Sequence, residues 1–367
     1  MREITADNLA ALAIGAGILG TGGGGNPRVG MLTALQHVKA GAPIRVVGIE
    51  EVGDDAFATS VGGMGAPVVS VERLPRGDEP LNALRALEHH LGRAFTHLIP
   101  GEIGGANSMR PLIVAAQTGL PVVDGDGMGR AFPELQMDTF TIYGVPPTPG
   151  AICDPRGHVA IFDGIAEAQT LERYARAVTI QMGGAAGYAF PPMDAAQLRR
   201  TTIPGTITLA QRIGEAVLGA RNGRGNPIDA ALAVSGGRRL FHGKITDVER
   251  RLEGGFARGM VVIAGADEDE GRTLHIDFQN ENLIARDGQG AVLAVVPDLI
   301  CIVDQDSAEP ITTELLRYGL RVAVLAIPAP ELLKTPEALA VVGPAAFGYP
   351  DVAYEPMDGV FGVGAHG

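Results

Sequence analysis

The segment from residue 96 to residue 124 constrains the fold more than any other part of the chain. A short apolar run at 96–100 predicts a buried strand, a helical pattern follows over 109–119, and a second apolar run begins at Pro121. Strand, loop, helix and strand in this order form a βαβ unit, whose parallel strands direct their carboxyl ends toward one crevice. The segment therefore predicts an α/β fold with a ligand site at that edge of the sheet.

The pattern of apolar residues changes at about residue 166. Before it, helical and strand-like runs alternate, whereas after it short apolar runs are separated by Gly, Asp and Asn turns. We expect an N-terminal Rossmann-like α/β domain over residues 1–165 and a β-rich C-terminal domain over residues 166–367. Helices are expected at 5–18, 27–40, 80–92, 168–182 and 207–220, and further strands at 44–48, 56–61, 256–264, 273–278, 291–295, 299–303 and 320–327.

Composition excludes several classes of partner. The net charge is -13, whereas proteins that bind nucleic acids carry basic faces. No apolar run is long enough to cross a bilayer, and no signal peptide is recognisable at the N-terminus. Two cysteines, without CxxC spacing, fit a reducing compartment. We expect a cytoplasmic protein that binds a small molecule, not nucleic acid or a membrane, and a homo-oligomer is compatible with this.

A glycine-rich loop at residues 20–25 separates the first two predicted helices. Its backbone N–H groups, at the start of a helix opened by Pro27, can bind a carboxylate or a phosphate. The loop is no dinucleotide fingerprint because it follows a helix, and it is no P-loop because no Gly-Lys-Ser/Thr ends it. The alternative is a tight helix-to-helix connection. The candidate substrate-binding residues here are Gly22, Gly23, Gly24 and Asn26.

Carboxylates follow two neighbouring strands of the predicted βαβ unit. Glu102 follows the first strand, and Asp124, Asp126 and Glu134 follow the second. If the two strands pair, these groups meet in one pocket, where carboxylates suit general acid/base catalysis or the binding of a divalent metal such as Mg²⁺ or Mn²⁺. The four are candidate catalytic residues, and the pattern does not decide whether a metal is required. The alternative is a solvated Asp-Gly turn.

Polar residues with a binding role are expected at three further places. Arg130 has the planar fork that matches a substrate carboxylate, with a structural ion pair as the alternative. Asn107 lies in the loop after the first strand, where it also suits a helix N-cap. Asn280, Glu281 and Asn282 follow an apolar strand, and a simple turn would need only one of them.

Five motifs together resemble the S-methyl-thiohydantoin desulfurase family, long described as a domain of unknown function. They are Gly-Thr-Gly-Gly-Gly at 20–24, Gly-Glu-Ile-Gly-Gly at 101–105, the block 124–134, Asn-Glu-Asn-Leu at 280–283 and Pro-Asp-Leu-Ile at 297–300. The resemblance implies an α/β domain followed by a β-rich domain, sometimes associated with hydantoinase and oxoprolinase-type proteins. It also implies a hydrolase for a small anionic heterocycle, in which water replaces a methylthio group and methanethiol is released.

The candidate residues can be fitted to this reaction from their chemistry alone. Asp124 or Glu102 would activate water, Asp126 or Glu134 would protonate a ring nitrogen or the leaving sulfur, and Arg130 would hold a substrate carboxylate. Three alternatives stay open: a ring-opening amidohydrolase of the hydantoinase or oxoprolinase type, a non-catalytic nucleotide- or anion-binding protein, and acidic loops that only organise an oligomer interface.

Overall fold

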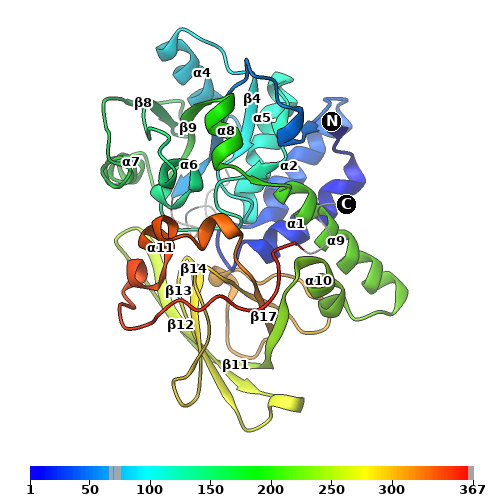
Figure 1. Cartoon of the computed structure of the whole chain (residues 1–367). Coiled ribbons are helices and arrows are strands. Elements are labelled where there is room, and N and C mark those ends of the chain that lie inside the picture. The colour runs from blue at the N-terminus through cyan, green and yellow to red at the C-terminus, as the bar shows by residue number, and fades with distance from the viewer. Residues whose placement is uncertain (66–68, 70–75, 363–367) are drawn as a thin grey trace.

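A computed structural model describes residues 1–65, 69 and 76–362 of the chain. A sheet with helices on its faces forms the N-terminal part, and a curled antiparallel half-barrel forms the C-terminal part (Figure 1). The expected α/β fold with a second, β-rich domain is confirmed. No helix in the described ranges is both long and apolar enough to cross a membrane.

The first sheet has eight strands in the order β1-β2-β5-β4-β3-β9-β7-β8. Strands β2, β5, β4 and β3 are parallel, with α4 and α5 as the crossovers, so the predicted βαβ unit is confirmed. The strands are β1 (Arg2–Glu3), β2 (Arg45–Val47), β3 (Phe57–Gly65), β4 (His97–Pro100), β5 (Val122–Val123), β7 (Gly150–Cys153), β8 (Val159–Phe162) and β9 (Ala185–Asp194).

Both faces of this sheet are covered. Leu98 and Val122 pack with helices α1, α2, α4 and α5 on one face, and their chain neighbours Ile99 and Val123 pack with α6 and α8 on the other. Alternation along an extended strand sends neighbouring side chains to opposite faces. The helices are α1 (Ala6–Leu19), α2 (Pro27–Lys39), α4 (Glu79–Leu91), α5 (Arg110–Thr118), α6 (Thr139–Ile142) and α8 (Ala195–Thr201).

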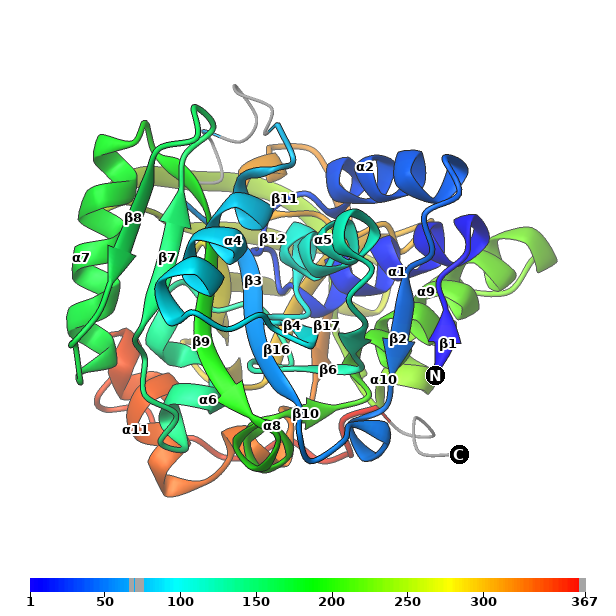
Figure 2. The same cartoon turned by 90° about the horizontal axis from the view of Figure 1, so that it is seen from above.

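Strand β9 (Ala185–Asp194) lies beyond the expected domain boundary but belongs to the first sheet. It lies beyond residue 165 but pairs antiparallel with β3 and β7 in the first sheet, where Figure 2 shows it between them. Strands β7, β8 and β9 were not predicted: β7 and β8 are only four residues long, and Gly187 and two prolines interrupt the apolar run of β9. The preceding helix α7 spans Ala168–Gln181. The two parts of the chain are therefore interleaved.

Helix α9 (Thr206–Gly223) joins the two parts by packing against α1. The two backbones touch at reciprocal glycines: a Cβ built on Gly15 would lie 1.8 Å from the Ala210 carbonyl oxygen, and one on Gly214 would lie 1.8 Å from that of Ala11. Such an approach is possible only without side chains at both glycines. Helix α10 (Pro227–Ser235) then leads into the half-barrel.

The second sheet is antiparallel throughout, in the order β15-β14-β13-β12-β11-β17-β16. Its inner face holds a separate apolar core that includes Phe241, Val261 and Ile276. The strands are β11 (Arg238–Glu253), β12 (Phe256–Gly265), β13 (Thr273–Gln279), β14 (Glu281–Asp287), β15 (Val292–Val295), β16 (Leu299–Asp304) and β17 (Arg321–Ile327), followed by α11 (Pro336–Val342). A small ribbon of β6 (Gly125–Asp126) and β10 (Ile203–Pro204) lies between α9 and the first sheet.

Candidate functional site

A cavity of about 330 Å³ lies where the carboxyl ends of β3 and β4 meet the tip of the β13–β14 hairpin. Its wall includes the first turns of α2 and α5, residues from the segment after β6, and one face of β9 near Tyr188. Seven of the predicted site residues line it: Gly24, Asn26, Glu102, Asn107, Glu134, Asn280 and Glu281. The crevice expected from the βαβ unit is thus closed by the C-terminal part.

The glycine-rich loop lies at the junction of the two parts of the chain. A Cβ on Gly24 would lie 2.3 Å from the Gly104 carbonyl oxygen, so this loop and the loop after β4 pack backbone against backbone. The amide of Thr313 donates to the Gly22 carbonyl at 2.8 Å, and the Ala106 amide donates to that of Gly24 at 2.9 Å. The loop connects two helices tightly, as the alternative interpretation expected, and it also forms part of the cavity wall.

Glu281 fills the space that Gly23 leaves open. A Cβ on Gly23 would lie 1.9 Å from the Glu281 Oε1 atom. Asn280 separates β13 from β14 in a left-handed conformation, with φ of 58°, and so directs Glu281 from the hairpin tip toward the glycine loop. Asn tolerates this conformation better than most residues. The group that this loop receives is therefore a side chain of the protein itself.

The Glu281 carboxyl is buried, and its Oε2 atom has no hydrogen-bond partner in the described part of the chain. Burial, and next the nearby Glu102 carboxyl, raise the pKa of Glu281 well above its ordinary value. Removal from water disfavours the charged form of an acid, and a second carboxylate disfavours it further. Both effects favour the protonated form of Glu281.

Glu102 is buried in the loop that follows β4. Its carboxyl accepts a hydrogen bond from the Asn107 side-chain amide and another from the Phe132 backbone N–H at 3.3 Å. Burial raises the pKa of Glu102 to about 8, although these two hydrogen bonds act in the opposite direction. Asn107 in turn is fixed by Gly63, with its Oδ1 atom 2.9 Å from the Gly63 amide. Glu102 and Glu281 form a pair of buried acids that interact electrostatically.

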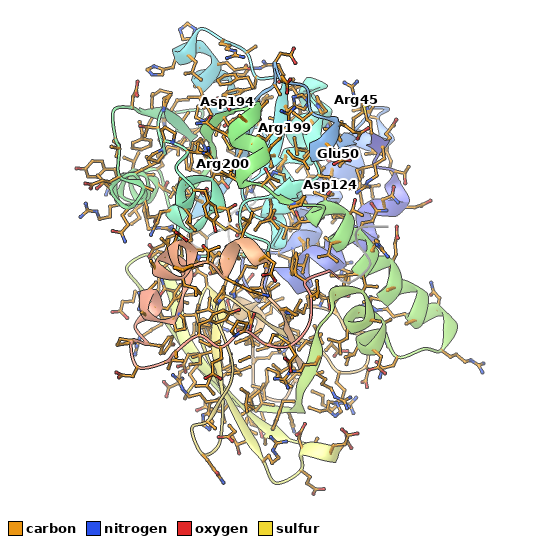
Figure 3. All side chains as sticks on the ribbon, in the orientation of Figure 1. Arg45, Glu50, Asp124, Asp194, Arg199 and Arg200 are labelled. Carbon is orange, nitrogen blue, oxygen red and sulfur yellow. The ribbon has the colours of Figure 1, made fainter. Side chains whose placement is uncertain are left out.

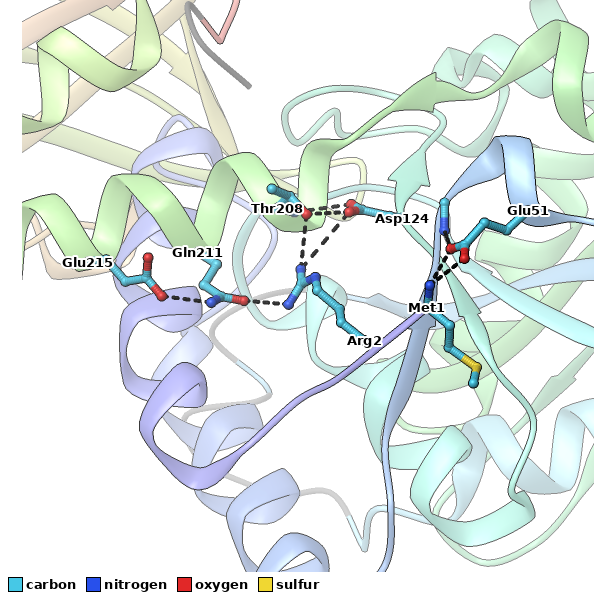
Figure 4. A network of polar contacts seen from close by, with 8 residues as sticks. Met1, Arg2, Glu51, Asp124, Thr208, Gln211 and Glu215 are labelled. Carbon is cyan, nitrogen blue, oxygen red and sulfur yellow. Dashed lines mark hydrogen bonds and ion pairs between the residues drawn. The ribbon is translucent and has the colours of Figure 1, made fainter. Parts of the chain in front are cut away.

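Asp124 is not among the described residues that line this cavity. Strands β4 and β5 pair as expected, but the chain turns after β5 toward α9, and Asp124 lies beside the first turn of that helix (Figure 3). Its Oδ1 accepts from the Thr208 amide at 3.0 Å, and Oδ2 accepts from the Thr208 hydroxyl and lies 4.0 Å from Arg2 (Figure 4). The shared pocket of Asp124 and Glu102 that strand pairing suggested is not present.

Asp126 organises the loop that follows β6. It is completely buried, and one carboxyl oxygen accepts from the amides of Ile103 at 2.7 Å, Met128 at 3.0 Å and Gly129 at 2.8 Å. Burial raises its pKa to about 7. It too is absent from the described cavity wall, so the structure places it where it holds two loops together and not where it would meet a ligand.

Arg130 is also completely buried and joins the two parts of the chain. Its guanidinium donates to the carbonyls of Ala131, Pro297, Asp298 and Asn282 and to the Thr21 hydroxyl, at 2.9 to 3.2 Å. These contacts occupy all five N–H donors of an arginine. The predicted grip on a substrate carboxylate is therefore not available to Arg130.

The remaining predicted residues have mixed positions. Glu134 lines the cavity and accepts from the Gln136 amide. Asn26 lines it as well, while its side chain caps α2 by accepting from the Arg28 amide at 2.9 Å. Gly22 and Asn282 support the junction behind the wall, where the Asn282 Nδ2 donates to the Ile300 carbonyl at 2.9 Å.

Arg110 and Tyr188 are cavity residues that were not among the predicted site. Both lie over glycines of β3: a Cβ on Gly63 would be 2.4 Å from the Arg110 Cζ, and one on Gly62 would be 2.4 Å from the Tyr188 hydroxyl. Burial lowers the pKa of Arg110 and raises that of Tyr188. Consecutive glycines within a strand signal a close neighbour, which is the clue that the sequence contained. Glu314 also lines the cavity, and burial raises its pKa.

The described residues contain no group of three or more His, Cys, Asp or Glu side chains placed to hold a metal ion. The cavity acids come from separate elements. Glu102 follows β4, Glu134 follows β6, Glu281 begins β14, and Glu314 lies in the short 3-10 helix Thr313–Leu315. What the described cavity wall offers chemically is three acids with raised pKa values, several amide groups and two guanidinium groups.

Comparison with known proteins is consistent with this architecture. Residues 7–164 match the family model of the S-Me-THD-like N-terminal domain, and residues 166–357 match that of the S-Me-THD-like C-terminal domain. The chain belongs to the S-Me-THD-like family.

A solved structure supports the fold over its full length. A crystal structure of a protein from Chromobacterium violaceum superposes with a TM-score of 0.79 at 26% sequence identity, over 98% of this chain and 100% of that one. No match to a curated protein was found.

Proposed function

We propose that the chain hydrolyses an S-methyl-thiohydantoin, replacing the methylthio group with oxygen. The observation that carries the proposal is the buried acid pair of Glu102 and Glu281 in one cavity, with raised pKa values for both. Family membership points to the thiohydantoin ring. A pair of acids in a shared, water-poor site is a common device for acid/base catalysis near neutral pH.

The proposed reaction assigns one role to each acid. Glu281, whose raised pKa favours its protonated form, protonates the ring nitrogen next to the carbon that bears sulfur, while the Glu102 carboxylate removes a proton from the attacking water. A carbon–oxygen bond forms and the carbon–nitrogen double bond becomes single. The carbon–sulfur bond then breaks, the thiolate takes the proton from Glu102, and the new hydroxyl returns its proton to Glu281. Water and substrate give a hydantoin and methanethiol, and both acids are restored.

Asn107 and Glu134 have supporting roles in this proposal. The Asn107 Nδ2 atom donates to the Glu102 carboxyl and to the Gly63 carbonyl, and the Asn107 Oδ1 atom accepts from the Gly63 amide. Asn107 thereby fixes the position of the Glu102 carboxyl. Glu134 is the one predicted catalytic residue besides Glu102 that reaches the cavity.

The test is methanethiol release from a carboxylate-bearing S-methyl-thiohydantoin, with the ring products identified by mass spectrometry. Thiol release with an intact hydantoin ring supports the proposal. A new carboxylate without thiol would instead identify a ring-opening amidohydrolase, and binding without any turnover would identify a non-catalytic protein. Repeating the assay with a chelator and with added Zn²⁺, Mn²⁺ or Mg²⁺ decides whether a metal takes part.

The acid pair is tested by Glu102→Gln and Glu281→Gln, which keep the side-chain shape and remove the proton transfer. We expect each to lower kcat by about 10²- to 10⁴-fold, the usual effect of losing a general acid or base. Asp194→Asn is the control, because it retains the N-cap of α8 at the opposite end of β9 from the cavity. Full activity in either glutamine variant would remove that residue from the mechanism.

A further inference from the structure

Arg110 lies in the cavity wall, where the backbone of β3 leaves room for its guanidinium. It is the first residue of α5, and its guanidinium lies flat against the backbone of β3, where a Cβ on Gly63 would come within 2.4 Å of Cζ and 2.7 Å of Nε. The glycine at position 63 is what admits the guanidinium. The side chain is thus held in place by backbone, and its position does not depend on a hydrogen-bonding partner.

The Arg110 guanidinium is half-buried, with Glu79, Tyr188 and Glu102 as its electrostatic neighbours. Its Nε is buried without a hydrogen bond in the described part of the chain. The nearby Glu79 carboxyl is already used by the amides of Arg76 and Gly77, at 2.8 Å each. By contrast Arg176, the other arginine in the described wall, pairs with Glu172 and donates to the Pro133 carbonyl at 3.0 Å.

We infer that Arg110 selects substrates that carry a carboxylate, by binding that group while the acid pair acts on the ring. The inference rests on the proposed function for the ring chemistry. The Nε atom is buried without a hydrogen bond, and a ligand carboxylate in the cavity would give the guanidinium two parallel hydrogen bonds. A single guanidinium beside buried acids matches a ligand of one negative charge better than a phosphate dianion. Arg110, not Arg130, is then the arginine that recognises the anion.

The experiment measures binding, so that it does not depend on turnover. Calorimetry compares hydantoin-5-acetate with its neutral amide, on the full chain and on the variants Arg110→Gln and Arg110→Lys. We expect the unmodified protein to prefer the carboxylate by about 10- to 100-fold in Kd, the range for a hydrogen bond to a charged group. Arg110→Gln should abolish this preference, and Arg110→Lys should retain only part of it because the fork is lost.

The control variant is Arg199→Gln on α8, which loses an exposed ion pair with Asp54 at the far end of β9 and should keep the full preference. Circular dichroism establishes that each variant is folded. Equal binding of the two ligands by the unmodified protein, no binding of either, or an unchanged preference in Arg110→Gln would overturn the inference. Failure of the proposed function is seen separately, as absence of methanethiol release from charged and uncharged S-methylated rings alike.

Discussion

At the scale of single residues, burial decides the chemistry of the site. Asp126 and Glu102 both have pKa values raised by burial, to about 7 and about 8. Asp126 nevertheless accepts three backbone N–H groups inside a loop, whereas Glu102 faces the cavity. A raised pKa alone therefore does not mark a catalytic residue, since structural networks perturb titration as well.

The pKa of Glu102 sets the expected dependence of catalysis on pH. Because its carboxylate is the proposed base, kcat/KM should rise with pH and level off above about pH 8. The value of kcat/KM should decrease again only at the higher pH values where Glu281 loses its proton. A pH-rate profile between pH 5.5 and 10 measures this, with Glu134→Gln as a comparison that should retain the rising limb. A rate that decreases steadily from pH 6 to pH 8 would contradict the assignment of Glu102 as base.

At the scale of elements, the contact between α1 and α9 holds the two parts of the chain together. It depends on Gly214, whose added Cβ would meet the backbone of Ala11 and not a flexible side chain. We expect Gly214→Ala to lower the free energy of unfolding by about 2 kcal/mol or more, since overpacking against backbone forces the helices apart. Chemical denaturation monitored by circular dichroism gives the value.

The same helix offers a matched control for this prediction. Gly219 has nothing within 4 Å of its would-be Cβ, so Gly219→Ala should stabilise the protein by roughly 0.5 to 1 kcal/mol through helix propensity alone. Equal effects of the two substitutions would show that the close contact of α1 and α9 does not contribute to stability.

At the scale of the whole molecule, buried acids couple stability to pH. The pKa values of Asp126, Asp138 and Glu102 are about 7, 7 and 8 in the folded chain, and all three are raised by burial. Unfolded carboxyls titrate near pH 4, so between pH 5 and 7 the folded chain holds protons that the unfolded chain has lost. The free energy of unfolding should therefore fall as the pH rises from 5 to 8, by on the order of 1 kcal/mol per pH unit for each group.

Thermal unfolding at pH 5, 6, 7 and 8 measures this slope. Asp138→Asn keeps the cap that Asp138 provides to α6 but cannot titrate, and it should flatten the slope. Asp154, whose pKa is lowered to about 2, makes the free energy of unfolding depend on pH below pH 4 and not between pH 5 and pH 8. Stability that increases from pH 5 to pH 8 would contradict the prediction.

The sequence by itself determined the βαβ unit, the β-rich second part and the motifs that place the chain in its family. Those features are local, because strand and helix periodicity and glycine turns depend on near neighbours. It also singled out Glu102, Asn107 and Glu281, which line the cavity, since each stands in a polar motif that follows or begins a strand.

Only the tertiary structure decided which polar residues meet in the cavity. Asp124 accepts a hydrogen bond from α9, and the Arg130 donors are occupied by groups of the two parts of the chain. Arg110 lies in the cavity wall against Gly63. Strand β9 joins the first sheet from beyond the expected boundary and brings Tyr188 with it. The physical reason is that burial and hydrogen-bond pairing arise from contacts between residues far apart in the chain, which no local pattern encodes.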